Sequence, residues 1–508
     1  MCCFAWSPLD LTNDRSDENK ENHRNQFRMI SFSINRLIAR TCNLRRFSHI
    51  DCTNNCERIK NIRAVLSKSP SDQLYRINGW IRGKVHRFRT KWFFHLEDGS
   101  SATRLQVIIP NELIDSKECL KINNGSSVEC IGSIQKSHGS MQAIDFHCVK
   151  LKIIGDCPLD QYQISHLGKN IEFDILREMP HLRPRLRYFQ SILRIRNELN
   201  KAIRDYMESN DFFEVQVPCI TTNDCEGGGE CFTLSPMNWQ NDGNKFYFGR
   251  PVFLTSSGQL HLEALASSLS KVFSMSTVFR AEKTMSQKHL SEFQMLEVEE
   301  SFIFDLDTLL DRVEDLIKHL IRWLESKCDE DLAYLLATNA FETQFDALKR
   351  CHFIRISYEE ARNILAENFP QIKTNNLNLN AQMERFLLEY FQNKFIFITK
   401  FPFELKPFYM KRSCDANTMD CFDLLAPISG EICGGSLREH ILENLEDNLY
   451  TKNMSTDQLQ WYLDLRRFGS GASGGFGLGF DRLIQTICGV RNIKDVATFP
   501  RWPYHCHL

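Results

Sequence analysis

The sequence predicts an α+β protein in which a small N-terminal β-barrel precedes a larger mixed domain. Short β-rich runs separated by turn residues fill residues 74–154. From residue 184 onward, strand-like alternation is mixed with amphipathic helical patterns. The length of 508 residues is also too great for one compact domain, because domains usually contain about 100–200 residues. We therefore expect at least two domains.

The composition excludes several classes of protein. With 42% hydrophobic and 25% charged residues, the chain differs from collagens, coiled coils and disordered proteins. Its formal charge of −2 means that any nucleic-acid binding must come from a local basic patch. No apolar run reaches the roughly 18 residues that span a bilayer, so we expect no membrane segment. The 19 cysteines are irregularly spaced, which favours reduced thiols over a disulfide framework.

Residues 1–50 are predicted to be an N-terminal extension. Residues 29–50 contain no Asp or Glu, and their arginines alternate with Ile, Leu, Phe and Ser. An acid-poor stretch of this kind is typical of an organellar transit peptide, with a basic linker as the alternative. Because Met29 opens the stretch, we hypothesise that translation from Met29 yields an imported protein of the mitochondrial matrix.

Residues 70–154 predict a five-stranded barrel, for which the OB-fold is the natural candidate. Turn residues such as Asp98-Gly99 and Asn124-Gly125 separate the β-rich runs. Aromatic rings and cations on the strands are suited to single-stranded bases and phosphates, although about half of the rings must fill the core. These residues are Trp80, Phe88, Trp92, Phe93, Phe94, Arg76, Arg82, Arg87, Arg89, Lys91 and Arg104.

Residues 155–183 are predicted to form a linker, and residues 184–508 one large α+β domain. Within it, residues 187–209 have the apolar spacing of a long helix, and a strand follows that ends at Pro218. Residues 303–392 are mostly amphipathic helices and are predicted to be structural.

Two segments of the large domain carry residues suited to nucleotide chemistry. Residues 277–300 predict a hairpin, and a cation with an aromatic ring at its open end could bind phosphate and base. The hairpin would bring together Arg280, Glu282, His289, Glu292 and Phe293. In the second segment, alternate glycines at 475, 477 and 479 precede Arg482 and permit close backbone approach. This pattern is neither a Rossmann fingerprint nor a P-loop, and each segment alone has a structural alternative.

His505-Cys506-His507, near the C-terminus, are residue types that bind metal ions. No second ligand pair is visible in the sequence. We therefore expect a frayed tail rather than a metal site.

Taken together, the two segments resemble motifs 2 and 3 of the class II aminoacyl-tRNA synthetases. Arg280 lies in F-R-x-E and Arg482 in G-x-G-x-G-F-D-R, while the long helix and the strand ending at Pro218 resemble motif 1. The resemblance covers about residues 70–508 and is greatest to asparaginyl-tRNA synthetases, of the aspartyl/asparaginyl/lysyl subgroup, and here of a mitochondrial type. Five further segments follow that family's order: HLRPR, TTNDCEGGGECF, LTSSGQLHLE, FDLLAPISGEICGGSLRE and WYLDLRRFGSG.

The resemblance implies an anticodon-binding OB domain followed by a class II catalytic domain, an antiparallel sheet with a helical insertion. It implies ATP-dependent ligation of L-asparagine to tRNA(Asn) through an asparaginyl-adenylate, by a homodimer that uses ATP and Mg²⁺ for mitochondrial translation. The amino-acid carboxylate is itself the nucleophile, so catalysis consists of alignment and neutralisation of spreading charge.

The family's motifs also imply roles for individual residues. Arg280 and Arg482 are the implied catalytic residues, with Arg280 at the α-phosphate and Arg482 and Phe293 on opposite faces of adenine. The implied ATP-binding residues are Arg280, Glu282, His289, Phe293, Glu431 and Arg482. The implied amino-acid-binding residues are Glu226, Gln259 and Arg438. The implied magnesium ligands are Asp423 and Glu431. The implied anticodon contacts are Phe93 and Gln106, with help from Arg87 or Arg89.

The choice of asparagine over aspartate follows from charge. Aspartyl enzymes resemble S-P-Q-L-Y-K, with a lysine where this chain has Leu262, and Glu263 follows here. Losing a cation and gaining an acid disfavours a bound carboxylate by several kcal/mol. Arg466 and Arg467 also match the asparaginyl pattern, with surface ion pairing as the alternative. We expect a neutral cavity with no lysine beside Arg438.

Three departures from the family's usual residues are expected to border the active site: Gly471–Ser473, Lys283 and Gln294. Rival functions are a nondiscriminating aspartyl-tRNA synthetase, an ammonia-dependent asparagine synthetase, and a non-catalytic RNA-binding relative. Leu262 argues against the first, the barrel against the second, and the retained Arg280 and Arg482 against the third.

Overall fold

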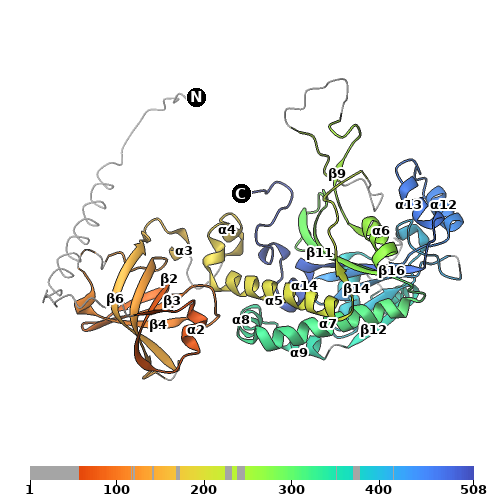
Figure 1. The fold of residues 1–508 in the computed structure, drawn as a ribbon. Helices are drawn as coiled ribbons and strands as arrows, with labels where there is room; N and C mark the ends of the chain where they lie inside the picture. The colour runs from red at the N-terminus through yellow and green to blue at the C-terminus, as the bar shows by residue number, and fades with distance from the viewer. Residues whose placement is uncertain are drawn as a thin grey trace, which may run out of the picture. The chain divides into compact units, whose positions relative to one another are not determined.

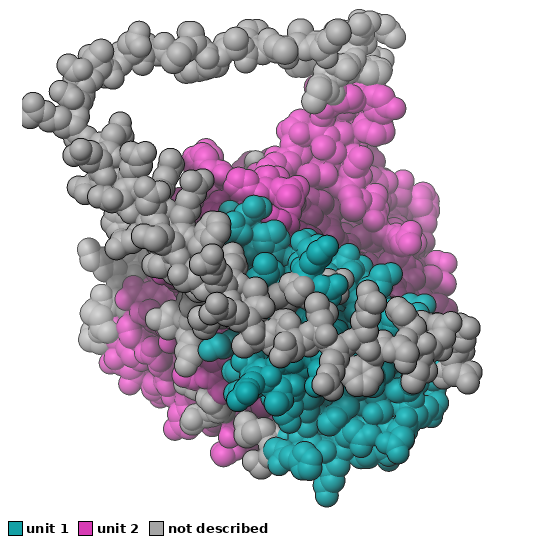
Figure 2. All heavy atoms as spheres, turned by 90° about the vertical axis from the view of Figure 1, so that its left-hand side faces the viewer, with its two compact units in different colours: residues 1–169 teal, residues 170–508 magenta. Residues whose placement is uncertain are grey.

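The computed structural model describes residues 56–508, apart from 116, 118–119, 140–141, 167–171, 223–230, 237–245, 351, 370–377 and 416. The predicted extension of residues 1–50 and the predicted ligand Glu226 lie outside the described residues. The chain divides into two compact units, residues 1–169 and residues 170–508 (Figure 2). No described helix is both long enough and apolar enough to cross a membrane.

The first unit is a closed β-barrel (Figure 1). Strand β2 pairs with both β3 and β5, so the sheet closes in the order β2-β3-β4-β6-β5, and β4 and β6 are parallel. The short β1 pairs with β2 outside this ring. The elements are β1 (Glu57–Arg58), α2 (Ile62–Leu66), β2 (Ser71–Arg87), β3 (Lys91–Glu97), β4 (Leu105–Pro110), η1 (Asn111–Leu113), β5 (Ser127–Lys136), β6 (Ile144–Gly155) and α3 (Gln163–His166).

Strand alternation and turn chemistry explain the barrel. Leu105, Val107 and Ile109 on β4 are fully buried and fill its interior. The predicted turn glycines adopt left-handed backbone angles, with φ of 83° at Gly99 and 97° at Gly125, which L-residues rarely adopt. The predicted OB-like barrel is confirmed.

The second unit is built on an eight-stranded sheet with the order β12-β13-β14-β15-β16-β11-β10-β7. Neighbouring strands are antiparallel except for the edge pairs β12–β13 and β10–β7. The strands are β7 (Phe213–Glu214), β10 (Lys271–Phe279), β11 (Glu292–Ser301), β12 (Phe353–Ser357), β13 (Phe395–Thr399), β14 (Cys421–Ala426), β15 (Gly430–Leu437) and β16 (Ser473–Gly479). A separate pair is β8 (Ile220–Thr221) with β9 (Phe253–Leu254).

Helices cover this sheet and confirm the α+β class (Figure 1). Helix α5 packs against α7 and α8, α7 packs on β15 and β16, and α6 packs on β10 and β11. The helices are α4 (Phe173–Arg177), α5 (Arg187–Ser209), α6 (Gln259–Leu269), α7 (Leu306–Lys327), α8 (Asp329–Asn339), α9 (Glu342–Lys349), α10 (Tyr358–Asn368), α11 (Ala381–Tyr390), α12 (Leu442–Thr451), α13 (Gln460–Arg467) and α14 (Phe480–Ile487), with 3₁₀ turns η2 (Arg183–Arg185), η3 (Phe403–Leu405) and η4 (Ile493–Asp495).

The block of residues 303–392 is not purely helical. It contains β12, which adds an edge strand in parallel register with β13, from Phe353 opposite Phe395 to Ser357 opposite Thr399. Its alternating Phe-Ile-Arg-Ile-Ser pattern favours a strand despite the helical surroundings.

Two arginines attach the start of the second unit to a segment near its C-terminus. Arg177 donates two hydrogen bonds to Asp495, at 2.9 and 2.6 Å. Arg183, which is 1% exposed, donates to the carbonyl oxygens of Lys494, Ala497 and Thr498. A buried guanidinium has five donors, which is why one side chain can satisfy several carbonyls.

Candidate active site

A cavity of about 220 Å³ in the second unit brings both motif-like segments together. Arg280 from the hairpin and Arg482 from the glycine-rich segment both line it, as required if they surround one ligand. All six residues predicted to bind ATP line this cavity: Arg280, Glu282, His289, Phe293, Glu431 and Arg482. Their individual roles stay predictions.

The hairpin positions the first of these residues. Strands β10 and β11 are antiparallel, with Val278 opposite Phe293, and Arg280 follows directly after β10. The Arg280 guanidinium carbon lies 5.7 Å from the Phe293 ring centroid, so a cation and an aromatic face meet at one end of the cavity. Glu292 does not line the cavity and instead forms a β-bridge with Arg501.

His289 is held in the connecting loop by two polar neighbours. Its Nδ1 lies 2.5 Å from the Ser286 hydroxyl, and its Nε2 lies 3.5 Å from the Glu282 carboxylate. Burial, followed by the charge of Arg482, lowers the pKa of His289 despite Glu282. The imidazole is therefore neutral at pH 7. A neutral imidazole keeps one N–H donor, which is available to a phosphate oxygen.

Arg482 is fixed by backbone carbonyls from two other segments. It lies in the first turn of α14, and its guanidinium donates to the carbonyl oxygen of Glu431 at 2.7 Å and of Lys288 at 3.3 Å. Because carbonyls carry no net charge, the positive charge of Arg482 is left for an anionic ligand.

A second cavity, of about 510 Å³, adjoins the first. Arg280, Met295, Glu431 and Gly477 line both, so a ligand could extend from one into the other. The second cavity is also lined by predicted substrate and metal residues, namely Gln259, Asp423 and Arg438.

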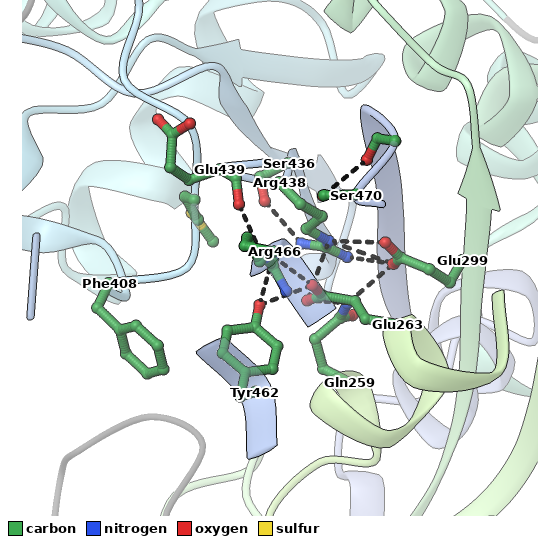
Figure 3. Close-up of polar contacts among 12 residues, drawn as sticks. Gln259, Glu263, Glu299, Phe408, Ser436, Arg438, Glu439, Tyr462, Arg466 and Ser470 are labelled. Atoms are coloured by element: carbon green, nitrogen blue, oxygen red, sulfur yellow. Dashed lines mark hydrogen bonds and ion pairs between the residues drawn. The ribbon is translucent and has the colours of Figure 1, made fainter. Parts of the chain in front are cut away.

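Beside the second cavity lies a buried cluster of two glutamates, two arginines, a glutamine and a tyrosine (Figure 3). Arg438 donates to Glu299 at 2.9 Å, and Glu299 also accepts from Gln259 at 2.8 Å. Arg466 donates to Glu263 at 2.7 Å, and Glu263 accepts from the Tyr462 hydroxyl at 2.6 Å. Two positive and two negative side chains make this paired cluster neutral, as a buried set requires.

The glycines of β16 make room for this cluster. A Cβ at Gly475 would lie 2.8 Å from Arg438 Nη2 and would also collide with Glu299. The glycine at this position is thus required by the buried Arg438–Glu299 pair rather than by a ligand. At Gly477, a Cβ would lie 3.1 Å from Met295 Sδ, where both cavities meet.

The expectation of a cavity without lysine is wrong. Lys406 and Lys452 both line the second cavity with Arg438. Lys406 is neutralised, because its Nζ lies 2.6 Å from both oxygens of Asp423. Lys452 donates to the Phe403 carbonyl at 3.1 Å. The position expected to decide specificity, Leu262, is fully buried and packs on Ala266 and Val272.

Asp423 and Glu431 form a donor set that fits a hard cation. A Cβ at Gly434 would lie 3.4 Å from Asp423 Oδ1 and 3.5 Å from Glu431 Oε1, so both carboxylates face one open space. Burial raises the pKa of Asp423 to about 6. The positive charge of Lys406 opposes this rise, and the negative charges of Glu431 and Glu384 add to it. Excess negative charge with carboxylate oxygens suits Mg²⁺.

The three departures from the family pattern do not line either cavity among the described residues. Gln294 accepts a hydrogen bond from Arg196 at 3.1 Å, on the strand face opposite Phe293. Lys283 is exposed, and a Cβ at Gly471 would contact Phe302. Lys283 follows Glu282, and Gln294 lies between Phe293 and Met295, so both stand next to residues that line the first cavity.

Arg466 and Arg467 separate into two environments. The Arg466 side chain is 4% exposed and belongs to the buried cluster. Arg467 lies at the surface and pairs with Asp464 and Glu446. Only the second therefore fits the surface ion-pairing alternative.

A third cavity, of about 330 Å³, lies on the barrel. Phe93 on β3 and Gln106 on β4 line it, together with His86, Phe88 and His95. Not all predicted cations are available there, since Arg82 and Arg104 both bind Glu97, at 2.6 and 2.9 Å. Arg87 lies over the Trp92 ring and donates to the Ile122 carbonyl.

Sequence reasoning assigned no role to several charged residues at or beside these cavities, among them Lys288, Glu384, Glu299 and Lys406. Lys288 and Glu384 form an ion pair at 3.6 Å beside Glu431, and Glu384 comes from the block predicted to be structural. Glu299 lies in the hairpin segment of residues 277–300 but was given no role, and Lys406 lies outside the segments that resemble the family. Strand alternation around Phe293 could have assigned Glu297 and Glu299 to the same face.

The adjoining cavities, with Arg280 and Arg482 at the first of them, are suited to an anionic nucleotide beside a polar substrate. A family profile described as "tRNA synthetases class II (D, K and N)" matches residues 173–503. Asparaginyl-tRNA synthetase of Homo sapiens is 39% identical over 452 residues, covering 88% of this chain and 93% of the relative. "Probable asparagine--tRNA ligase, mitochondrial" of Dictyostelium discoideum is 37% identical, covering 85% and 93%.

A solved structure gives the same result. Asparaginyl-tRNA synthetase of Pyrococcus horikoshii, complexed with asparaginyl-adenylate, superposes with a TM-score of 0.79 at 28% identity, covering 89% of this chain and 100% of that chain. The chain belongs to the class II tRNA synthetases of the D, K and N group and, within it, to the asparagine–tRNA ligases.

Proposed function

We propose that the chain ligates L-asparagine to tRNA(Asn) in two steps, through an asparaginyl-adenylate, for mitochondrial translation. The observation that carries the proposal is the meeting of Arg280 and Arg482 around one cavity that opens into a second, amide-compatible one. The adenylate named in the Pyrococcus horikoshii complex supports the intermediate.

In the first step, an oxygen of the asparagine carboxylate attacks the α-phosphorus of ATP. The bond from that phosphorus to the oxygen bridging to the β-phosphate breaks, and pyrophosphate leaves. Arg280, which borders both cavities, neutralises the charge at the reacting phosphate. Phe293 and Arg482 hold the adenine between them, and Glu282 and His289 assist ATP binding. In the second step, the terminal adenosine hydroxyl of the tRNA attacks the carbonyl carbon of the adenylate; an ester bond forms, the bond from that carbon to the phosphate oxygen breaks, and AMP and the hydroxyl proton leave.

Gln259 and Arg438 orient the amino acid, with Glu226 at its α-amino group. Arg438 donates to the side-chain carbonyl of asparagine. Because Glu299 and Glu263 pair the arginines of the buried cluster, the cluster itself offers no net positive charge to an aspartate carboxylate. Asp423 and Glu431 would hold Mg²⁺, which supplies neutralisation of phosphate charge when bound.

Two contacts outside the catalytic centre complete the proposal. Phe93 and Gln106 read unstacked anticodon bases, supported by their common cavity on the barrel. The protein acts as a homodimer through the region after α5, where Phe213 and Ile220 leave apolar side chains exposed. Sedimentation of the purified chain tests this assembly.

Amino-acid-dependent ATP–pyrophosphate exchange tests the catalytic proposal. We expect asparagine to support exchange, and aspartate to support it at least about 100-fold less, because an added buried charge costs several kcal/mol. Equal exchange with both would indicate a nondiscriminating aspartyl enzyme. Formation of free asparagine from aspartate and ammonia without tRNA would instead indicate an asparagine synthetase.

The mitochondrial assignment rests on the Arg-rich stretch after Met29 and on the mitochondrial label of the Dictyostelium discoideum relative. We expect the protein recovered from mitochondria to begin after the acid-poor stretch of residues 29–50. Sequencing the N-terminus of the mature protein measures this. A mature chain that begins at residue 1 or 2 would contradict import.

A further inference from the structure

The C-terminal tail is ordered against the start of the second unit, so the expectation of a frayed tail is wrong. The Arg501 carbonyl accepts from the Ser291 backbone at 2.8 Å, and the Arg501 side chain donates to the carbonyls of His507 and Leu508. The Trp502 and His505 rings stack at 3.5 Å between centroids. These contacts hold the two terminal histidines in fixed positions.

The missing ligand partner comes from a distant part of the chain. Glu178, just after α4, lies 3.4 Å from His505 Nε2 and 3.2 Å from His507 Nε2, measured from its carboxylate oxygens. Ligand atoms of the three residues all lie within 4.8 Å of one another. Within the described part of the chain, no other three His, Cys, Asp or Glu residues are grouped so closely.

These separations match those of a tetrahedral metal site. Zinc binds imidazole nitrogen and carboxylate oxygen at about 2.0–2.2 Å, which places neighbouring ligand atoms about 3.3–3.5 Å apart. The two separations from Glu178 agree with this value. A small movement of the two imidazoles toward each other would bring all three ligand atoms to this spacing.

The burial of His505 is the independent sign of a ligand. Its residue is 7% exposed, yet neither ring nitrogen makes a hydrogen bond of good geometry, and Nε2 only approaches the Glu178 carboxylate, at 3.4 Å. Burying a polar group without a good partner is unfavourable, and a bound metal ion would remove this cost at one nitrogen. The Trp502 stack holds the ring in place, with Nε2 near the Glu178 carboxylate.

We propose that Glu178, His505 and His507 bind a divalent transition-metal ion, with Zn²⁺ as the expected occupant. Two imidazoles with one carboxylate suit zinc better than magnesium or calcium, which prefer oxygen ligands only. Three protein ligands leave a fourth position for water, and the exposure of Glu178 and His507 gives the ion access.

The bound ion would tie the tail to the segment before η2. The tail in turn pairs with Ser291, two residues from His289 in the nucleotide cavity. The ion is thus a structural clamp on the edge of the catalytic unit and takes no part in adenylate formation.

Zinc binding to the purified full-length chain tests the proposal. After removal of metal with a chelator, we expect the chain to bind one Zn²⁺ that His507→Ala binds at least about tenfold more weakly. Glu178→Gln is expected to act in the same direction. Cys506→Ala is the matched control, because this exposed tail residue is not in the ligand group, and its zinc binding should equal that of the unchanged chain.

Two further readouts separate this site from a thiol site and from a simple ion pair. Co²⁺ in the site should give a spectrum without thiolate-to-metal charge transfer, and Zn²⁺ should raise the Tm of the unchanged chain but not of His507→Ala. Equal zinc affinity in His507→Ala and the unchanged chain would overturn the proposal, as would loss of binding in Cys506→Ala. Neither readout depends on aminoacylation.

Discussion

Replacing Arg280 with alanine is expected to lower asparagine-dependent ATP–pyrophosphate exchange by about 1,000-fold or more. Arg280 lines both cavities, at the junction where the amino acid would meet ATP. Charge that develops at a phosphate in the transition state is neutralised there by a pre-positioned guanidinium, and removing one such group typically costs about 10²–10⁵ in rate. ATP–pyrophosphate exchange assays on the purified protein, stopped at fixed times, measure the loss.

The control is Arg322→Ala, because Arg322 is an exposed arginine on α7 that lines neither cavity. Its exchange rate should match that of the unchanged chain. The Arg280→Ala variant should still bind tRNA, because the proposed anticodon contacts lie on the barrel. Exchange by Arg280→Ala within tenfold of the unchanged chain would contradict the assignment of Arg280 to the reacting phosphate.

Replacing Glu299 with glutamine is expected to reduce both stability and the preference for asparagine. Glu299 is fully buried and pairs with Arg438 at 2.9 Å. Without the Glu299 carboxylate, the Arg438 guanidinium keeps only the Glu263 carboxylate, at 3.8 Å. Breaking a buried ion pair costs about 3–5 kcal/mol of unfolding free energy. Burial alone would lower the pKa of Arg438, but Glu299 and Glu263 raise it, so the arginine stays charged.

The specificity effect follows from the sign of the remaining charge. Without Glu299 the buried cluster carries one net positive charge, which favours an aspartate carboxylate over an asparagine amide. The asparagine-to-aspartate ratio of exchange rates should therefore fall, while unfolding by denaturant reports the loss of stability.

Glu300→Gln is the matched control for this second prediction. Glu300 is the next residue on β11 and is also buried, but it pairs with Lys271 and Arg312, both at 3.3 Å. Successive strand residues face opposite sides of a sheet. The control should lose stability without a change in specificity. If both variants keep the same ratio of exchange rates, charge in the cluster does not select the amino acid.

Local sequence patterns were sufficient to predict the helices and strands, and to predict the hairpin side of the first cavity. The barrel strands follow from alternation and from turn glycines such as Gly99, because these signals depend only on nearby residues. The hairpin that carries Arg280 and Phe293 follows in the same way, since antiparallel pairing of two strands that are consecutive in the sequence is a local interaction.

Residues that act through distant partners could not be assigned in this way. Lys406 looked like an ordinary loop lysine, but it neutralises Asp423 in the second cavity. Leu262 looked like a specificity position, but it lies in the core, and the charged side chains beside the second cavity are Glu299 and Arg438. Whether a side chain pairs, packs or faces a cavity depends on which strands become neighbours.

The sequence by itself determined the α+β class, the barrel, the hairpin and the family, because alternation, turn residues and motif spacing are properties of adjacent residues. The family resemblance implied that Arg280 and Arg482 meet, and the structure places both at one cavity, but only the tertiary structure decided that Lys406 pairs with Asp423 and that Glu178 lies beside His505. These contacts join segments far apart in the chain. They exist because the order of strands in the eight-stranded sheet and the burial of paired charges bring those segments together.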